Sequence, residues 1–281
     1  MNFLRGTGIK ACRNLAQLLN VVQSQSQVRC MRCARPVALM FSTPPQLQHP
    51  RYQHSVSFNA SWSTNDLSTW QKMKWDMGFY GKLQVPNRRL KLSGYNLYVC
   101  CTDFIDFPEF VKETGIPDTF NSWFSLLQLH LWLVYVKLSQ MGPEGFLLKN
   151  HMYSSMWHGV EKRLEKFEDM LGSERRKAVK NFYSMMVLSI MHYDEAILSS
   201  DKLLANALWL QLFGQDADVA PDKLALMVEY IRKQVQYHDS LDPSQLMQPG
   251  YISFLPLHGD RLDVAKADAD FQTLTKNKDI Y

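Results

Sequence analysis

The stretch DTFNSWFSLLQLHLWLVYVKL, residues 118–138, carries the strongest structural signal in this chain of 281 residues. Pro117 precedes it and Gly142-Pro143 follows it, and such residues mark where helices begin and end. No charged residue occurs from residue 119 to residue 136, so the run reaches the lower edge of transmembrane length. The stretch therefore predicts one long helix that either lies at the centre of a fold or spans a membrane.

Polar side chains inside this stretch favour the first alternative. At about 100° per residue they gather on one side of the helix, and the large apolar side chains gather on the other. The polar set is Asn121, Ser122, Ser125 and Gln128, and the apolar set is Phe120, Trp123, Phe124, Leu127, Leu131 and Val134. We therefore expect a buried central helix around which the core forms.

Apolar residues recur at helical spacing in several other segments, each bounded by capping or breaking residues. We expect helices over residues 70–77, 144–171, 173–197, 201–212 and 221–235. No internal repeat or alternating strand pattern is evident. The sequence predicts an all-α fold: a single helical bundle over residues 66–242, between a disordered N-terminal transit segment and an irregular C-terminal tail over residues 243–281.

The first 65 residues contain none of the chain's 27 Asp and Glu but seven of its 31 Lys and Arg. The seven are Arg5, Lys10, Arg13, Arg29, Arg32, Arg35 and Arg51. A basic, acid-free start that can coil as an amphipathic helix is typical of a mitochondrial transit peptide, and we assign residues 1–65 to such a peptide and its linker. An N-terminal arm that binds nucleic acid is the alternative.

Cysteine and histidine spacing gives little support for a metal site. Cys30 and Cys33 have zinc-ligand spacing, but no second pair completes the four ligands that structural zinc requires. Two His-x-x-Glu pairs, His158 with Glu161 and His192 with Glu195, occur on consecutive predicted helices. They fall away from the predicted core, whereas di-metal ligands project into a bundle. Solvated helix faces explain them better, and a metal-dependent helical-bundle enzyme stays the alternative.

A basic stretch precedes the central helix and includes Lys82, Arg88, Arg89 and Lys91. Such a cluster could meet anionic lipid or ribosomal RNA, but a solvated face is the favoured interpretation. A mitochondrial RNA-binding or ribosome-binding factor is therefore a further alternative. No nucleophile elbow, P-loop, dinucleotide fingerprint or zinc-protease motif appears, which removes the commonest enzyme classes.

Three residues within the predicted bundle call for a specific environment. His130 lies on the apolar side of the central helix, where a hydrogen-bonded core histidine is the favoured interpretation. Trp132 points toward the polar side, where it either anchors a partner or packs against a neighbouring helix. Asp194 flanks an apolar stripe, and because an unpaired carboxylate there would be costly, we expect a Lys or Arg partner for it.

Several segments together resemble the ubiquinol-cytochrome c chaperone family, the mitochondrial assembly factors for cytochrome b of respiratory complex III. The matching residues are Trp123-Phe124, Leu129-His130-Leu131-Trp132, Tyr193-Asp194-Glu195, Leu204-Ala205-Asn206-Ala207-Leu208-Trp209 and Val228-Glu229-Tyr230-Ile231-Arg232-Lys233-Gln234. The resemblance covers roughly residues 66–239. Ala196 stands where the family has Gly and Leu210 where it has Arg, which puts in doubt any ion pair of that Arg with Asp194 or Glu195.

The resemblance implies a protein that is not an enzyme and needs no cofactor or metal. With a small helical partner, such a protein binds newly made cytochrome b at the matrix face of the mitochondrial inner membrane, near the mitochondrial ribosome. It implies peripheral contact with that membrane. The candidate residues for binding the partner or client are Trp132, Tyr193, Asp194, Glu195 and Trp209.

Overall fold

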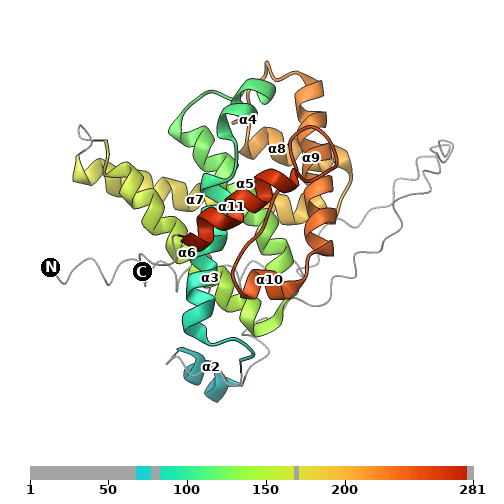
Figure 1. The fold of residues 1–281 in the computed structure, drawn as a ribbon. Helices are drawn as coiled ribbons and strands as arrows, with labels where there is room; N and C mark the ends of the chain where they lie inside the picture. Colours follow the sequence, from blue (N-terminus) through green and yellow to red (C-terminus); the bar gives the residue numbers. More distant parts are fainter. Residues whose placement is uncertain (1–67, 77–82, 168–170, 277–281) are drawn as a thin grey trace, which may run out of the picture.

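The computed structural model describes residues 68–76, 83–167 and 171–276, which form ten helices and no strand (Figure 1). The helices are α2 Thr69–Asp76, α3 Asn87–Asp103, α4 Phe107–Thr114, α5 Phe120–Leu138, α6 Gly142–Leu164, α7 Gly172–Ile197, α8 Asp201–Gln211, α9 Pro221–Ser240, α10 Pro243–Met247 and α11 Val264–Lys276. The predicted all-α fold is confirmed. The predicted transit peptide and linker, residues 1–65, lie outside the described residues.

Helix α5 is the centre of the fold, as its sequence predicts. It packs against α3, α6, α7 and α9, and 15 of its 19 side chains are buried. The Thr119 hydroxyl caps its start by accepting a 3.3 Å hydrogen bond from the backbone N–H of Ser122. Three residues of the expected polar side, Ser122, Ser125 and Gln128, are buried as well, and the Ser189 hydroxyl of α7 donates a 2.9 Å hydrogen bond to Gln128, whereas Asn121 is exposed. Within the described ranges, no helix is both long enough and apolar enough to cross a membrane.

The helix predicted over residues 144–171 is shorter than expected. Helix α6 ends at Leu164, and Gly172 is the first residue of α7. The α7 start uses the Glu174 carboxylate, which accepts a 3.2 Å hydrogen bond from the backbone N–H of Leu171. The end of α6 and the start of α7 project to one side of the body (Figure 1).

Helix α3 has no counterpart among the predicted helices, because the small and polar Ser93, Gly94 and Asn96 interrupt the apolar residues of its buried face. These residues let α3 and α6 approach closely. A Cβ atom on Gly94 would lie 2.6 Å from the His151 Cβ, and one on Gly159 would meet the Tyr98 hydroxyl. The α3–α6 packing therefore depends on glycine at both positions.

The C-terminal segment differs from the expected irregular tail. It contains α10 and α11, and its Leu246, Ile252, Leu257 and Leu274 are buried. Gln234 of α9 holds it by donating to the carbonyl of Leu255 at 2.8 Å and accepting from its N–H at 3.1 Å. The prediction of an irregular tail therefore needs correction. The sequence pattern missed this segment because its buried side chains are spaced too irregularly to show a helical period. The core thus continues across the predicted boundary at residue 242.

Candidate partner-binding site

Trp132 of α5 lies against Tyr193 and Asp194 of α7. The indole Nε1–H of Trp132 donates a 2.7 Å hydrogen bond to Oδ1 of Asp194. The ring centroids of Trp132 and Tyr193 are 5.2 Å apart. We call these three residues, with Lys149 of α6, the Trp132 cluster. Three helices meet at this cluster, and three of its members, Trp132, Tyr193 and Asp194, are among the five residues predicted to bind the partner or client.

Burial changes the interpretation of the two aromatic residues. Trp132 is 1% exposed and Tyr193 is 0% exposed. Of the two alternatives predicted for Trp132, the structure shows packing against a neighbouring helix, since α7 lies against that side of α5. The Tyr193 hydroxyl has no hydrogen-bond partner among the described residues, and burial raises its pKa. Trp132 holds Asp194 from within and Tyr193 packs against the Trp132 ring, and the part of both in partner binding stays a prediction.

Asp194 and Lys149 influence each other's charge. The Asp194 residue is exposed on its outer side, yet the surrounding protein removes enough water from the carboxyl group to raise its pKa. The Trp132 hydrogen bond and the Lys149 charge act in the opposite direction. Desolvation likewise lowers the pKa of Lys149 to about 8, and the Asp194 charge opposes that shift. The expected basic partner of Asp194 is thus Lys149, acting through its charge, whereas Trp132 supplies the hydrogen bond.

The other two predicted residues lie outside this contact. Glu195 is exposed on α7. Trp209 of α8 is partly buried, and its Nε1–H donates a 2.7 Å hydrogen bond to the carbonyl of Asp216, which fixes the turn after α8. In the part of the chain that the structure describes, no hydrogen bond or ring contact joins Trp209 to the Trp132 cluster. The five candidates therefore fall at two places.

A buried polar contact fixes α7 to α5 and α8. The Ser189 hydroxyl lies 2.9 Å from Oε1 of Gln128 and 3.0 Å from Oε1 of Gln211. Gln211 in turn donates from Nε2 to Nδ1 of His192 at 2.7 Å. Because a buried polar group without a partner is costly, these bonds define how α7 is rotated against its neighbours. The inner face of α7 is therefore held firmly.

The four residues of the metal-enzyme alternative do not assemble into a site. His158 and Glu161 are exposed on α6, and His192 is engaged by Gln211 of α8. Within residues 68–76, 83–167 and 171–276, no three His, Cys, Asp or Glu side chains lie close enough to hold a metal ion. The geometry therefore gives this alternative no support.

Arg88, Arg89 and Lys91 are exposed on the first turns of α3, as expected for a solvated face.

Arg232 is a positioning residue that the sequence did not single out. Its Nη1 donates to the carbonyl of Ile197 at 2.8 Å, its Nη2 donates to the carbonyl of Ser199 at 3.1 Å, and Nε donates to Asp201 at 3.1 Å. A cation at the end of a helix satisfies carbonyls that lack helical partners. Arg232 thereby ties α9 to the turn between α7 and α8. The preference for basic residues near helix ends is the one sequence signal for this role of Arg232. That preference does not predict that Arg232 contacts Asp201, 31 residues away, at the start of another helix.

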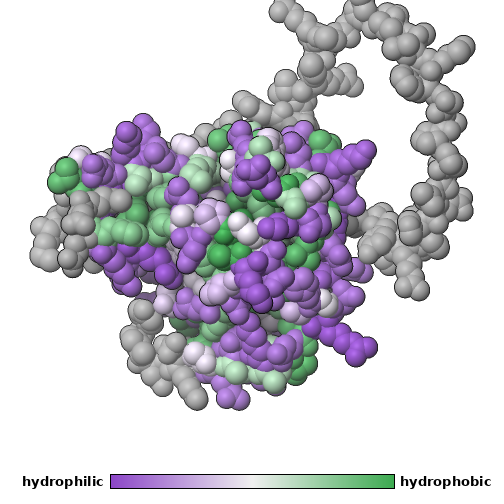
Figure 2. Space-filling model, turned by 90° about the horizontal axis from the view of Figure 1, so that it is seen from above, coloured by the Kyte–Doolittle hydropathy of each residue, from purple (hydrophilic) through white to green (hydrophobic). Residues whose placement is uncertain are grey.

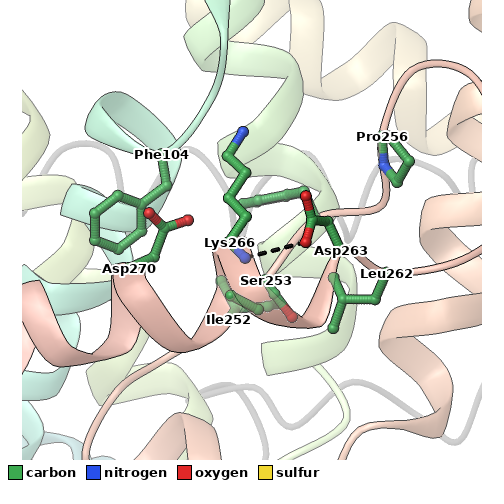
Figure 3. A pocket seen from close by; sticks show the side chains of 10 residues that line it. Phe104, Ile252, Ser253, Pro256, Leu262, Asp263, Lys266 and Asp270 are labelled. Carbon is green, nitrogen blue, oxygen red and sulfur yellow. Dashed lines mark hydrogen bonds between the residues drawn. The ribbon is translucent and has the colours of Figure 1, made fainter.

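A small pocket lies between α11 and the segment of residues 252–256 (Figure 3). Asp263, Lys266 and Asp270 line its α11 side, and the backbone N–H of Lys266 donates a 3.1 Å hydrogen bond to Asp263. Burial raises the pKa of Asp270, whereas the charge of Lys266 lowers it. The volume open to water-sized groups is about 60 Å³, which leaves room for the end of one side chain.

The family model that matches residues 112–253 is described as a ubiquinol-cytochrome C chaperone, and this range contains α5 to α10 with the Trp132 cluster. The class that the fold and the comparison define is thus a helical chaperone. Because the matched range covers half of the chain, the chain belongs to the ubiquinol-cytochrome c chaperone family.

Individual relatives agree with this membership. The chain is 38% identical over 181 residues to the ubiquinol-cytochrome-c reductase complex assembly factor 1 of Xenopus laevis, a match that covers 64% of this chain and 90% of the relative. It is 36% identical over 184 residues to the Homo sapiens protein of the same name, covering 64% of this chain and 60% of that relative. The mitochondrial protein CBP3 of Saccharomyces cerevisiae is 28% identical over 151 residues, with 52% and 44% covered. No solved structure matches the chain.

Proposed function

We propose that this protein is an assembly chaperone for the ubiquinol-cytochrome c reductase complex, respiratory complex III. In this proposal it binds and stabilises newly synthesised cytochrome b at the matrix face of the mitochondrial inner membrane. The observation that carries the proposal is the family match over residues 112–253, supported by relatives named as assembly factors of that complex. The protein acts by binding and not by catalysis, together with a small helical assembly factor and near the mitochondrial ribosome.

The location follows from the same proposal. The basic, acid-free residues 1–65 direct import, because the inside-negative potential draws positive charge inward by about 2.3 kcal/mol per charge per 100 mV. The remainder, with 24 Lys and Arg against 27 Asp and Glu, then works in the matrix. Contact with the inner membrane is peripheral.

The acidic edge of α7 is the part of the candidate site that suits recognition of a client or partner. Asp194 and Glu195 are adjacent and exposed, and Trp132, which packs against Tyr193, holds Asp194 from the inside through its indole N–H. Basic segments of a partner would pair with this edge, which favours correct orientation more than raw affinity. Trp209 contributes by holding the turn that follows α8.

Cells that lack the protein provide the test. We expect the amount of assembled complex III to fall while the other respiratory complexes persist, and pulse-labelled cytochrome b to decay faster than in wild-type cells. Re-expression of the wild-type chain should restore both measurements. Normal complex III with normal cytochrome b lifetime in the null cells would refute the proposal.

A further inference from the structure

The outward face of α7 exposes large apolar side chains that the fold does not use. Leu188 is 50% exposed, Met191 is 40% exposed and Leu198, the residue that caps α7, is 65% exposed. Their spacing of three and seven residues places them on one side of the helix, with Glu195 between the last two. We call these four residues the α7 outer stripe. Soluble proteins seldom keep such a row of apolar residues exposed without a use for it.

This stripe lies on a helix whose opposite side is fixed. Phe182, Met186, Ile190 and Tyr193 of α7 are buried, and Ser189 and Asp194 hold α7 to α5 through Gln128 and Trp132. The outer stripe is therefore presented in one orientation before anything binds. Pre-organisation of this kind lowers the entropy cost of docking.

Exposed charges define what the stripe would accept. Glu195 lies within it and the exposed Asp194 lies on its flank, whereas Asp201 at the start of α8 is paired with Arg232 at 3.0 Å. Lys202, four residues after Leu198, is an exposed cation. The C-terminal half of the face thus combines apolar and acidic groups, which is complementary to an apolar surface flanked by basic residues.

We propose that the α7 outer stripe docks an amphipathic helix of a partner protein, with apolar residues against Leu188, Met191 and Leu198 and a Lys or Arg opposite Glu195. The proposal rests on the assembly function proposed above and adds the face and the chemistry of the partner. The stripe shares only Glu195 with the residues first expected to bind, and its other three residues are exposed apolar side chains outside the Trp132 cluster.

A second copy of this chain is a poorer occupant. The stripe runs over eleven residues, 188–198, which is about 15 Å of helix and too short to bury the roughly 800 Å² per partner of a stable dimer. Two copies packed antiparallel about Leu188 would also bring Leu198 near the exposed Lys177. A heterologous helix avoids this mismatch and gains a charge pair with Glu195.

The test places a photo-activated phenylalanine analogue at Leu188 in the full chain and irradiates intact mitochondria. The cross-linked peptide is then sequenced by mass spectrometry. We expect a peptide from another protein whose sequence has helical apolar spacing and a Lys or Arg within one turn of the contact. The same probe at Val264 of α11, which is 64% exposed, should not capture that peptide. Cross-links only to a second copy, only to lipid, or to nothing would overturn the proposal.

An exchange of charge between Glu195 and the partner is the second part of the test. Glu195→Lys is expected to lower recovery of the cross-linked partner about tenfold, and changing the partner's opposing Lys or Arg to Glu should restore it. Leu188→Asp combined with Leu198→Asp should lower recovery by at least as much, whereas Val264→Asp should leave it unchanged. Because all these positions are exposed, thermal melting should stay at the wild-type value, and this is measured for each variant.

The two proposals fail separately. If null cells assemble complex III normally, the assembly function falls whatever the cross-link shows. If the wild-type chain restores complex III and the Leu188→Asp, Leu198→Asp variant restores it equally with unchanged partner recovery, only the docking face is refuted.

Discussion

Replacing Trp132 by Phe is expected to lower the free energy of unfolding by about 3 kcal/mol, a large part of the stability of a domain. The change keeps an aromatic ring in the core but removes the Nε1–H that donates to Asp194 at 2.7 Å. The Asp194 carboxylate then loses its donor in a place where desolvation already raises its pKa. Among the described residues, the charge of Lys149 would then remain to offset the negative charge of Asp194.

The magnitude has two parts. A hydrogen bond to a charged group contributes about 1.5 to 3 kcal/mol. The smaller ring also leaves unfilled space beside Tyr193, and because Trp132 is 1% exposed, the surrounding core can relax only partly. This cavity adds about 1 kcal/mol. The two effects act in the same direction.

Urea unfolding followed by circular dichroism measures the loss, and a double-mutant cycle assigns it. Trp132→Phe and Asp194→Ala are studied singly and together, and we expect a coupling energy of about 1.5 kcal/mol or more. Glu195→Ala is the matched control, because Glu195 is the next residue along α7 and is exposed. This change should alter the free energy of unfolding by less than about 0.5 kcal/mol. A coupling energy below about 0.5 kcal/mol would refute the assignment of the hydrogen bond.

Three further outcomes are expected. Gly250→Ala should destabilise by about 3 kcal/mol, since its φ is +80° and a Cβ would press on the α3 backbone, whereas Gly142→Ala, with φ +65° and open space around it, should cost about 1 kcal/mol by urea unfolding. Burial lowers the pKa of His130 and of His238 from 6.5 to about 4, so the unfolded chain takes up protons first on acidification. Stability is full above pH 6.5 and should fall by up to about 3 kcal/mol per histidine as the pH drops to 4; an unchanged urea midpoint over that range would contradict neutral imidazoles. A chain ending at residue 242 should show no cooperative melting by circular dichroism, because it lacks the buried side chains of the C-terminal segment.

Helical period predicted the part of the fold that carries strong apolar stripes. Helices α5, α7, α8 and α9 lie where the pattern placed them, and His130 is the hydrogen-bonded core histidine that was expected. Its Nδ1–H donates to the carbonyl of Leu126 and its Nε2 accepts from the Tyr230 hydroxyl, each at 2.8 Å.

Helix α3 and the C-terminal segment could not be predicted from period. Ser93 and Asn96 on α3 are buried because they donate to the carbonyls of Met247 and Pro249, both at 2.8 Å. Such polar side chains resemble surface residues in a sequence, and only their partners about 150 residues later make them part of the core. Residues after 243 show no helical period for the same reason, because α3 and α9, far away in the sequence, determine which of their side chains are buried.

The candidate site also has features that the sequence predicted and features that it could not predict. The sequence showed that Asp194 needs a partner and that Glu195 is acidic and adjacent to it. It could not show that Trp132 supplies the hydrogen bond, since that contact joins residues 62 positions apart. Nor did it show that Leu188 and Leu198 are exposed, because exposure depends on which elements pack against α7.

The sequence by itself determined the all-α class, the central helix and the family, because local period, caps and motif residues depend only on neighbours along the chain. The tertiary structure decided which polar groups are buried, where Asp194 finds its donor and which face of α7 stays open. These properties depend on contacts between distant segments, and an apolar or polar residue has the same side chain whether another helix covers it or water does.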